Sequence, residues 1–406
     1  MKVLAANKYY FVKGGAERYF FELNHILERR GHEVVPFAMR HPSNEATDYD
    51  DHFVSFEAFD ESDGLAARVR AASRILYSRE ARRCIERLAD ETSPDVAHLH
   101  NVAHQLSPSI LYGLKSRGVP VVQTLHDFKL VCPNYSMFVD GKTCERCGTW
   151  RYYNAVIHRC MRGSVTSSAL VAIEAYVHKL LGSYSRNVDM FVAPSRQLRD
   201  RMIAHGVSAD RIVHLPYSIA LDDYTPSYES AGYGVYVGRL STGKGLETLV
   251  RALTGDRDIR MKIVGTGPLA DNLGRVVERE GLTNVEFVGY RKGEELRSLV
   301  AGALFVVVPS ECFENSPLTV YEAFAQGKPV VGARVGGIPE LVSDGESGVV
   351  FESGNHEDLA EKMRALWNDP ERAAEMGRAA RERVETHFGP DVHYQKMMAI
   401  YEGVMA

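Results

Sequence analysis

The chain has 406 residues, of which 45% are hydrophobic and 25% are charged, and this length suits two hydrophobic cores better than one. Its formal net charge of -5 gives no bulk attraction to nucleic acid or to an anionic membrane, which argues against nucleic acid as the main partner. The apolar start of the chain meets charge at Lys8, too early for a signal peptide, and no run approaches the roughly 20 apolar residues of a membrane span. We expect a two-domain protein of the cytoplasm that rests at most on the inner face of a membrane.

Short β-branched runs alternate with longer helical stretches along the chain, a pattern typical of parallel sheets covered by helices. The strands expected in the first half are 3–6, 34–38, 54–56, 96–100, 121–125, 190–193 and 212–216. Those expected in the second half are 234–237, 261–264, 285–288, 304–308 and 330–333. The expected fold class is α/β, with two Rossmann-like doubly wound parallel-sheet domains whose strand ends face a cleft for ligands.

The domain boundary is expected in 217–233, a stretch rich in Ser, Asp, Pro and Gly that has the composition of a linker. An N-terminal domain then covers residues 1–218, with an insertion at about 128–165, and a C-terminal domain covers 219–388. Residues 389–406 form a last helix, long enough to pack back across the boundary.

The segment 311–324 follows an apolar strand and opens a helix near Leu318, so its loop amides and the helix N-terminus can face an anion. Glu314 lies before this helix and Glu322 about one turn inside it, so the two carboxylates can reach different parts of one ligand. Two glutamates alone are better explained as unrelated acids of a solvated helix. The neighbouring turns change that judgement.

A glycine-rich turn after the strand 234–237 carries Gly238 and Arg239 and continues to Lys244 and Gly245. Two cations therefore stand at the carboxyl end of a strand, where they suit a diphosphate. The spacing is also similar to a phosphate-binding P-loop, but that loop needs Ser or Thr after the lysine, and Gly245 stands there instead. This mismatch excludes a P-loop NTPase.

Two further glycine turns follow strands of the second half. Gly265 and Gly267 lie in the turn 265–268, where glycine lets the backbone approach a nucleotide closely. Gly336 and Gly337 open the turn after 330–333. Together with the segment 311–324, these turns put four loops at the same edge of the expected sheet.

The turn 238–245, the turn 265–268 and the Glu314-to-Glu322 segment, in that order, resemble the GT-B retaining glycosyltransferases of family 4, and the resemblance covers essentially the whole chain. It implies a nucleoside-diphosphate sugar as donor, with Arg239 and Lys244 at the positions that bind the diphosphate. Glu322 matches the position that binds the ribose hydroxyls, and Glu314 the position that contacts the transferred sugar. The remaining donor contacts implied by the resemblance are Gly15, Gly238, Gly265, Gly267, Asn315, Ser316, Pro317, Leu318 and Thr319.

The first half adds a glycine loop and several histidines. Gly14 and Gly15 precede a helix and resemble the family's glycine loop under the donor phosphates and the acceptor, although a Gly-Gly pair alone is usually only a turn. His126 ends a strand, and the matching histidine of the family lies beside the reacting sugar. A lone histidine at a strand end is more often structural, but this position favours a functional role. The other acceptor-side candidates are His98, His100, Asn101 and His104.

A mechanism follows from these parts. Breaking the anomeric carbon–oxygen bond requires charge stabilisation on the departing diphosphate, and Arg239, Lys244 and helix-end amides can supply it without a divalent ion. We therefore expect catalysis without a metal or any other cofactor. The resemblance implies front-face attack with retention, in which the leaving phosphate takes the acceptor's proton and His126 orients the sugar and the acceptor.

Four of the six cysteines, Cys132, Cys144, Cys147 and Cys160, crowd into the insertion. In a reducing compartment this crowding favours a metal over disulfides. Four thiolates can hold a tetrahedral structural zinc, but the spacing is not that of a standard zinc ribbon. Two interpretations stay open, a structural zinc and a set of buried or free thiols.

Seven arginines recur beside apolar residues in the stretch 65–88, which predicts a basic amphipathic helix. A solvated structural helix is the better interpretation. If the acceptor is lipid-linked, this face is the one expected to touch the membrane.

The sequence thus predicts a glycosyltransferase that moves a hexose-type sugar from a nucleoside-diphosphate sugar to a saccharide, small-molecule or lipid-linked acceptor. Two alternatives stay open. One is a nucleotide-sugar epimerase of the same architecture, which would form product from the donor without an acceptor. The other is a nucleotide-sugar-binding protein without turnover.

Overall fold

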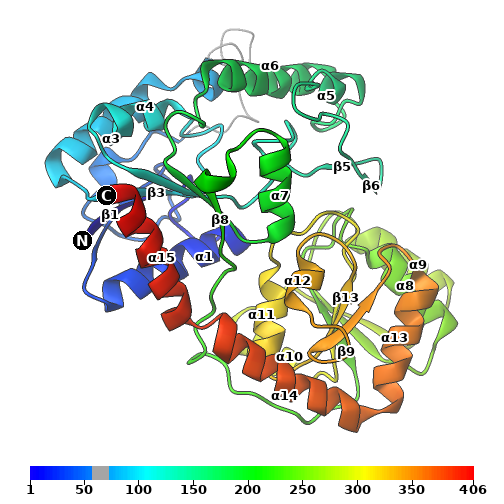
Figure 1. Ribbon diagram of the computed structural model, residues 1–406. Helices are drawn as coiled ribbons and strands as arrows, with labels where there is room; N and C mark the ends of the chain where they lie inside the picture. The colour runs from blue at the N-terminus through cyan, green and yellow to red at the C-terminus, as the bar shows by residue number, and fades with distance from the viewer. Residues whose placement is uncertain (57–72) are drawn as a thin grey trace. The chain divides into compact units, whose positions relative to one another are not determined.

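The structure is a computed structural model that describes residues 1–56 and 73–406 (Figure 1). The chain divides into two compact units. The first unit comprises Met1–Met137, Glu145–Pro216 and His393–Ala406, and the second comprises Phe138–Cys144 and Tyr217–Val392. The chain therefore leaves the first unit two residues before the boundary expected at 218, and its last helix belongs to the first unit.

A sheet of six parallel strands forms the centre of the first unit, in the order β2-β1-β3-β4-β7-β8. All residues of β3 and β4 are buried, as expected for a parallel sheet covered on both faces. The strands are β1 (Lys2–Ala6), β2 (Glu33–Phe37), β3 (Val96–Leu99), β4 (Val121–Thr124), β7 (Met190–Ala193) and β8 (Ile212–His214).

Serine side chains start several helices of this unit. The hydroxyls of Ser78, Ser164 and Ser195 accept hydrogen bonds from backbone amides of the first turns of α3, α6 and α7. The helices are α1 (Gly15–Arg29), α3 (Arg79–Thr92), α4 (Ser109–Ser116), α5 (Asn154–Ile157), α6 (Val165–Leu181), α7 (Arg196–Ala204) and α15 (Pro390–Met405), with short 3-10 helices at Asp50–His52 and Ala209–Arg211.

The last helix, α15, is held to the first unit by buried polar contacts. Its Tyr401 hydroxyl lies 2.6 Å from Nδ1 of His98 on β3, and Nε2 of its His393 lies 2.9 Å from the hydroxyl of Tyr19 on α1. Both residues of α15 are buried. The last helix therefore packs against the part of the first unit that carries the histidines.

The sequence analysis expects an insertion in the segment between β4 and α6. It contains α5 and a small antiparallel hairpin, β5 (Phe138–Val139) paired with β6 (Lys142–Thr143). The hairpin groups with the second unit, whereas the rest of the insertion groups with the first.

The second unit is also built on six parallel strands, in the order β11-β10-β9-β12-β13-β14. The strands are β9 (Gly234–Val237), β10 (Met261–Val264), β11 (Val285–Gly289), β12 (Val306–Val308), β13 (Val330–Ala333) and β14 (Gly348–Phe351). The helices are α8 (Leu246–Gly255), α9 (Ala270–Arg279), α10 (Gly293–Ala301), α11 (Leu318–Ala325), α12 (Ile338–Leu341), α13 (His356–Asn368) and α14 (Pro370–His387).

The strand order of the second unit locates a ligand crevice. From β9 the chain first adds strands on one side, β10 and β11, and then crosses to add β12, β13 and β14 on the other. The connections that follow β9 and β12 therefore lead in opposite directions along the sheet, and ligands of doubly wound sheets bind at this switch point. In the first unit the corresponding point lies between β1 and β3.

The predicted pair of doubly wound parallel sheets is confirmed, and the predicted strands 190–193, 234–237, 261–264 and 330–333 have the predicted bounds. The strand expected at 54–56 is wrong, because only an isolated bridge joins Val54 to Met39. The strand β14 and the β5–β6 hairpin were not predicted. Residues 65–72 of the basic stretch 65–88 lie outside the described residues, and α3 contains its residues 79–88.

None of the helices that the structure describes is both long enough and apolar enough to cross a bilayer.

Candidate active site

The loops after β9 and β12 meet through charged and backbone contacts at the switch point of the second unit. Nζ of Lys244, after β9, lies 2.5 Å from Oε1 of Glu314, after β12. The Ser310 hydroxyl donates to the same carboxylate oxygen at 2.8 Å. The amides of Glu311 and Cys312 donate to the carbonyl of Gly243 at 2.8 and 3.0 Å. Two residues that the sequence assigned to the donor thus form one ion pair.

Glycines make this close approach of loops possible. Gly245 has φ +69°, and a Cβ on it would lie 1.6 Å from the carbonyl oxygen of Pro309. Gly265 has φ +140°, and its Cβ would lie 1.9 Å from the carbonyl oxygen of Gly238. A side chain at either position would overlap the backbone of the neighbouring loop, in a conformation that residues other than glycine rarely adopt. The glycine turns therefore position the cations.

The Lys244–Glu314 pair is charged on both sides at neutral pH. Burial raises the pKa of Glu314, but the Lys244 ammonium and the Ser310 hydroxyl outweigh burial and hold that pKa below its usual value. The Glu314 charge in turn raises the pKa of Lys244. Burial and the same carboxylate raise the pKa of Cys312 to about 11, so this neighbouring side chain is a neutral thiol.

The helix α11 begins directly after this pair, with Pro317 as its N-cap residue. The first amides of an α-helix have no partner within the helix, so the start of α11 is suited to an anion. Oδ1 of Asn315 is buried and has no hydrogen-bond partner, which is uncommon for a buried polar atom. The Ser316 hydroxyl is within 2.6 Å of the Tyr321 hydroxyl, and Glu322 is 9% exposed on the helix.

The other donor candidates lie on the loops beside β9 and β10. Arg239 is exposed, and no ion pair joins its guanidinium to a carboxylate of the described residues. Gly267 packs on the loop after β9, because a Cβ there would lie 2.3 Å from the carbonyl oxygen of Leu240. Leu318 and Thr319 open α11. The second unit thus brings together Gly238, Arg239, Lys244, Gly265, Gly267, Glu314, Asn315, Ser316, Pro317, Leu318, Thr319 and Glu322 on adjoining loops and the helix that follows them.

The histidines form a stacked cluster at the carboxyl ends of β3 and β4. Nε2 of His126 lies 3.0 Å from Nδ1 of His100, and their ring centroids are 5.2 Å apart. His98 also stacks on His100, with ring centroids 4.5 Å apart. Tyr19 packs its ring against both His100 and His126. No pattern in the sequence indicated that Tyr19 would pack against these histidines.

Burial keeps the cluster neutral. It lowers the pKa of His126 to about 3, with a further contribution from Lys8, and it lowers the pKa of His98 to about 3 as well. Burial also lowers the pKa of His100. A neutral His126 can donate or accept one hydrogen bond but carries no charge at neutral pH.

The histidine candidates for the acceptor differ in whether a ring nitrogen is available to a ligand. Both ring nitrogens of His98 are used inside the unit, by the Tyr401 hydroxyl and by the Thr124 hydroxyl at 2.8 Å. His104 instead faces Glu174 at 3.4 Å. His98 therefore has no ring nitrogen for a ligand, against expectation, whereas Nε2 of His100 is buried without a hydrogen-bond partner.

The switch point of the first unit carries the remaining candidates. Asn101 joins the loops after β1 and β3, because its amide donates to Oδ1 of Asn7 at 3.1 Å and its carbonyl accepts from the Lys8 amide at 2.9 Å. Gly14 and Gly15 are exposed at the start of α1, and Gly14 has no side chain to cap the helix. The first amides of α1 are therefore open to an anion.

The four cysteines of the insertion divide between the units. Cys144 belongs to the second unit, and Cys132, Cys147 and Cys160 belong to the first. The Cys132 thiol donates to Oδ1 of Asn134 at 2.9 Å, and Cys147 and Cys160 pack in an apolar cluster around Tyr152. In residues 1–56 and 73–406, no group of three or more His, Cys, Asp or Glu side chains is arranged to hold a metal ion. The geometry gives the zinc site no support, and the zinc stays a prediction.

Several solved structures of glycosyltransferases share the fold of this chain. Sucrose-phosphate synthase from Thermosynechococcus elongatus superposes with a TM-score of 0.73 at 20% identity, over 99% of this chain and 98% of that one. HepE (Alr3699) of Anabaena, solved in complex with UDP and glucose, superposes with a TM-score of 0.70 at 19% identity, over 99% of this chain and all of that one. The fold is that of the GT-B glycosyltransferases.

The sequence families agree with the fold. Residues 13–223 match the model of Glycosyltransferase Family 4, and residues 223–383 match the model of Glycosyl transferases group 1. The chain belongs to glycosyltransferase family 4, as the residues of the second unit predicted.

Individual curated relatives match only about half of the chain. The sulfoquinovosyl transferase SQD2 of Arabidopsis thaliana is 31% identical over 219 residues, which are 50% of this chain and 42% of SQD2. A D-inositol 3-phosphate glycosyltransferase of Corynebacterium aurimucosum is 31% identical over 220 residues, 48% of this chain and 52% of that protein. The chain thus spans about half the length of the curated relatives it matches.

Proposed function

We propose that the chain transfers a hexose-type sugar from a nucleoside-diphosphate sugar to a saccharide or lipid-linked acceptor, with retention at the anomeric carbon and without a catalytic metal ion. The observation that carries this proposal is the Lys244–Glu314 ion pair at the switch point of the second unit. It joins a cation suited to a diphosphate and a carboxylate suited to sugar hydroxyls at the start of a helix.

Donor binding would exchange the partners of this pair. The diphosphate would take the Lys244 ammonium and the exposed Arg239 guanidinium, because both charge-assisted contacts are stronger than hydrogen bonds between neutral groups. The Glu314 carboxylate, still held by the Ser310 hydroxyl, would then accept hydrogen bonds from the sugar. The open amides of α11 and the buried Oδ1 of Asn315 offer further partners in the same place.

The transfer step needs only the atoms of the donor and the acceptor. The bond between the anomeric carbon and the β-phosphate oxygen breaks, and its electron pair stays on that oxygen. The acceptor oxygen bonds to the anomeric carbon on the same face and loses its proton to the leaving diphosphate. Arg239, Lys244 and the start of α11 stabilise the charge that grows on the diphosphate, so we expect no divalent ion to be needed.

His126 has an orienting role in this proposal. Its neutral ring is tied to His100 and packed against Tyr19, so its position is fixed before substrate binds. A group that is neutral at pH 7 can position a hydroxyl of the sugar or acceptor without adding charge to the transition state.

The first test is incubation of the purified chain with a panel of donors, with and without mono- and oligosaccharide acceptors. UDP and GDP sugars come first, because HepE was solved with UDP and a relative is named as a GDP-mannose-dependent mannosyltransferase. Glycoside product, or slow release of the free nucleotide, supports transfer. An epimerised donor without acceptor would indicate an epimerase, and binding without any reaction would indicate a binding protein.

A lipid-linked acceptor would require peripheral contact with a membrane surface. We expect the protein in the cytoplasm, at the inner face of the membrane if the acceptor is a lipid. Cell fractionation in low and high salt tests this expectation, since an electrostatic surface contact is released by salt and a soluble partition is not changed by it.

A further inference from the structure

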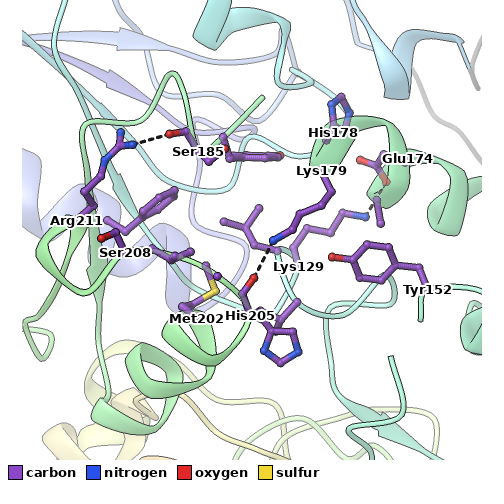
Figure 2. A pocket seen from close by; sticks show the side chains of 17 residues that line it. Lys129, Tyr152, Glu174, His178, Lys179, Ser185, Met202, His205, Ser208 and Arg211 are labelled. Atoms are coloured by element: carbon purple, nitrogen blue, oxygen red, sulfur yellow. Dashed lines mark hydrogen bonds and ion pairs between the residues drawn. The ribbon is translucent and has the colours of Figure 1, made fainter. Parts of the chain in front are cut away.

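A cavity of about 350 Å³ lies in the first unit between α6 and α7 (Figure 2). This size lies within the range of small-molecule pockets, about 300–1,000 Å³. Its walls are residues 129–131 after β4, the second half of α6, the turn before β7, Phe191 of β7 and residues around the end of α7. None of the candidate donor or acceptor residues lines it, so the cavity is separate from the site described above.

The charged side chains of the cavity leave an excess of positive charge. Lys129 is neutralised by Glu174, with Nζ 2.7 Å from Oε2, and both side chains are at most 10% exposed. Lys179 donates to the backbone carbonyl of His205 at 2.7 Å, and Arg211 donates to that of Ser185 at 2.5 Å. Among the described residues, neither of these two cations forms an ion pair with a carboxylate.

Figure 2 shows Lys179 between the other charged groups, with the Lys129–Glu174 pair on one side and Arg211 on the other. The cavity thus holds three cations and one carboxylate. Burial lowers the pKa of its His178, so this ring adds no charge. Lys179 and Arg211 are half-buried, and no carboxylate that lines the cavity pairs with them, although Asp210, which precedes Arg211 in the chain, interacts with its charge. The excess of positive charge makes the cavity suited to an anion.

The rest of the wall is apolar and well packed. Eight apolar or aromatic residues line it, among them the almost fully buried Val131, Tyr152, Phe191 and Met202. A small, strongly hydrated anion such as free phosphate would leave this part of the wall without contacts. The lining therefore fits a ligand that has an apolar body as well as an anionic group.

The surface beside the cavity has the same dual character. The Trp150 ring, 46% exposed, lies 6.0 Å from the Lys179 ammonium, and Ile173, Leu180 and Leu181 are exposed on α6. Residues 146–186 contain six Lys or Arg residues but a single acidic residue, the buried Glu174. Exposed apolar side chains among arginines form a surface that amphipathic anions approach.

We propose that this cavity is a second binding site, for an amphipathic anion that consists of an apolar chain and a phosphate or carboxylate group. The anionic group pairs with Lys179 and Arg211, and the chain lies against the apolar wall. Residues 129–131 follow His126 closely in the sequence, and the Lys129 amide donates to Oδ1 of Asp127 at 2.9 Å, so an occupant steadies the segment that carries His126. This inference goes beyond the proposed function and does not rest on it.

The test is calorimetric titration of the full chain with three probes below their micelle concentrations: dodecyl phosphate, dodecyl maltoside and inorganic phosphate. Dodecyl phosphate should bind at least about tenfold more tightly than the other two, because only it offers both an anion and a chain. Hexyl and decyl phosphate should bind with intermediate affinities. Equal affinities for all probes, or no dependence on chain length, would overturn the proposal.

Two variants locate the binding. Lys179→Gln should lower the affinity for dodecyl phosphate by about tenfold, as expected for the loss of one charge-assisted contact. Ala175→Phe should also lower this affinity, because the larger side chain fills the cavity. Lys292→Gln, which changes an exposed lysine of the second unit, is the matched control and should bind as the unchanged chain does. UDP-glucose should bind all these proteins equally. Unchanged binding of dodecyl phosphate to both cavity variants, with normal melting temperatures, would place the binding elsewhere and refute the site.

Vesicle sedimentation distinguishes the source of the ligand. If the ligand is a membrane lipid, the chain should sediment with phosphatidylglycerol vesicles and not with phosphatidylcholine vesicles, and Lys179→Gln should sediment less. If the ligand is a free amphiphile, dodecyl phosphate should bind while the chain sediments with neither. Either result supports the site, and equal sedimentation with both lipids, together with no binding of dodecyl phosphate, contradicts it.

Discussion

Replacing Lys244 by alanine tests the role of the ion pair at the switch point. The substitution removes the cation assigned to the diphosphate and leaves the Glu314 carboxylate with the Ser310 hydroxyl. Removing one preorganised electrostatic group from a transition state costs about 2–4 kcal/mol, which corresponds to a loss of about 30- to 1,000-fold in turnover. Donor affinity should fall as well, because the cation also contacts the diphosphate in the ground state.

The same substitution should destabilise the fold by a smaller amount. Breaking a fully buried ion pair costs about 3–5 kcal/mol, but the Lys244 side chain is 34% exposed, and water can replace part of its contact. We therefore expect a loss of about 1–3 kcal/mol. The folded-state pKa of Glu314 is lowered, so its share of the stability is present above the unfolded value of about 4.3 and is lost as pH falls through the folded pKa. The folded-state pKa of Lys244 is raised, so its share is present below the unfolded value of about 10.4.

The assay measures turnover and the donor Michaelis constant for the unchanged chain, Lys244→Ala and Lys262→Ala. Lys262 is a similarly exposed lysine of the same unit, paired with Glu286 on the neighbouring strand, and its loss should leave both constants unchanged. Thermal unfolding of Lys244→Ala should show a deficit that is constant from about pH 6 to 9 and shrinks below about pH 4. A Lys244→Ala enzyme with normal turnover at saturating donor would refute the assigned role.

Four further predictions follow from the site. Glu322→Ala should raise the donor Michaelis constant with a smaller effect on turnover, because a ribose contact is nearly the same in the ground and transition states. Steady-state kinetics at saturating acceptor measures both constants, and a loss of turnover alone would disprove this role. Gly265→Ala should lower the melting temperature by roughly 5–10 °C, because its Cβ would overlap the Gly238 carbonyl. Gly274→Ala in α9 is the control and should not destabilise the fold, because nothing lies within 4 Å of a Cβ there. Calorimetry compares the two variants. Transfer should continue in excess EDTA, and an absolute requirement for added magnesium or manganese would contradict the mechanism. Elemental analysis should find about one zinc per chain if the four cysteines of the insertion hold a metal, and metal-free protein with unchanged folding would exclude that site.

The sequence was sufficient to predict the sheets because parallel strands buried on both faces are continuous apolar runs. The runs 190–193 and 330–333 contain no charged residue and were found with their bounds. The residues 54–56 have the same local character but only one bridging partner at Met39, and pairing is decided by the neighbouring chain. Burial in tertiary structure, which local pattern does not report, separates the two cases.

The contacts at the site were harder to predict from the sequence than the strands were. The motifs placed Lys244 and Glu314 on loops of one sheet edge, because the carboxyl ends of parallel strands lie together. Their direct pairing depends on the close approach at Gly245, and a sequence records the glycine but not the carbonyl of Pro309 that it faces. The histidine cluster is similar, since Tyr19 and Tyr401 come from helices at opposite ends of the chain.

The unpaired cations of the cavity had no sequence signal at all. Lys179 stands between His178 and Leu180, and Arg211 between Asp210 and Ile212, without any recognisable motif. Only the fold shows that backbone carbonyls accept hydrogen bonds from these two cations. Side-chain partners far apart in sequence are set by packing, so buried ion pairs and their absence must be read from coordinates.

The most direct test of the proposed reaction is the anomeric configuration of the first sugar released from a donor. In the absence of acceptor, water can take the place of the acceptor hydroxyl, and proton NMR can follow UDP-glucose, or whichever donor of the panel binds, before the released sugar equilibrates. Front-face displacement at the site of Arg239, Lys244 and Glu314 predicts that the released sugar first appears with the configuration of the donor, in EDTA as well as in buffer. First appearance of the opposite anomer would contradict retention, and an epimerised nucleotide sugar with no release would contradict the assignment as a transferase.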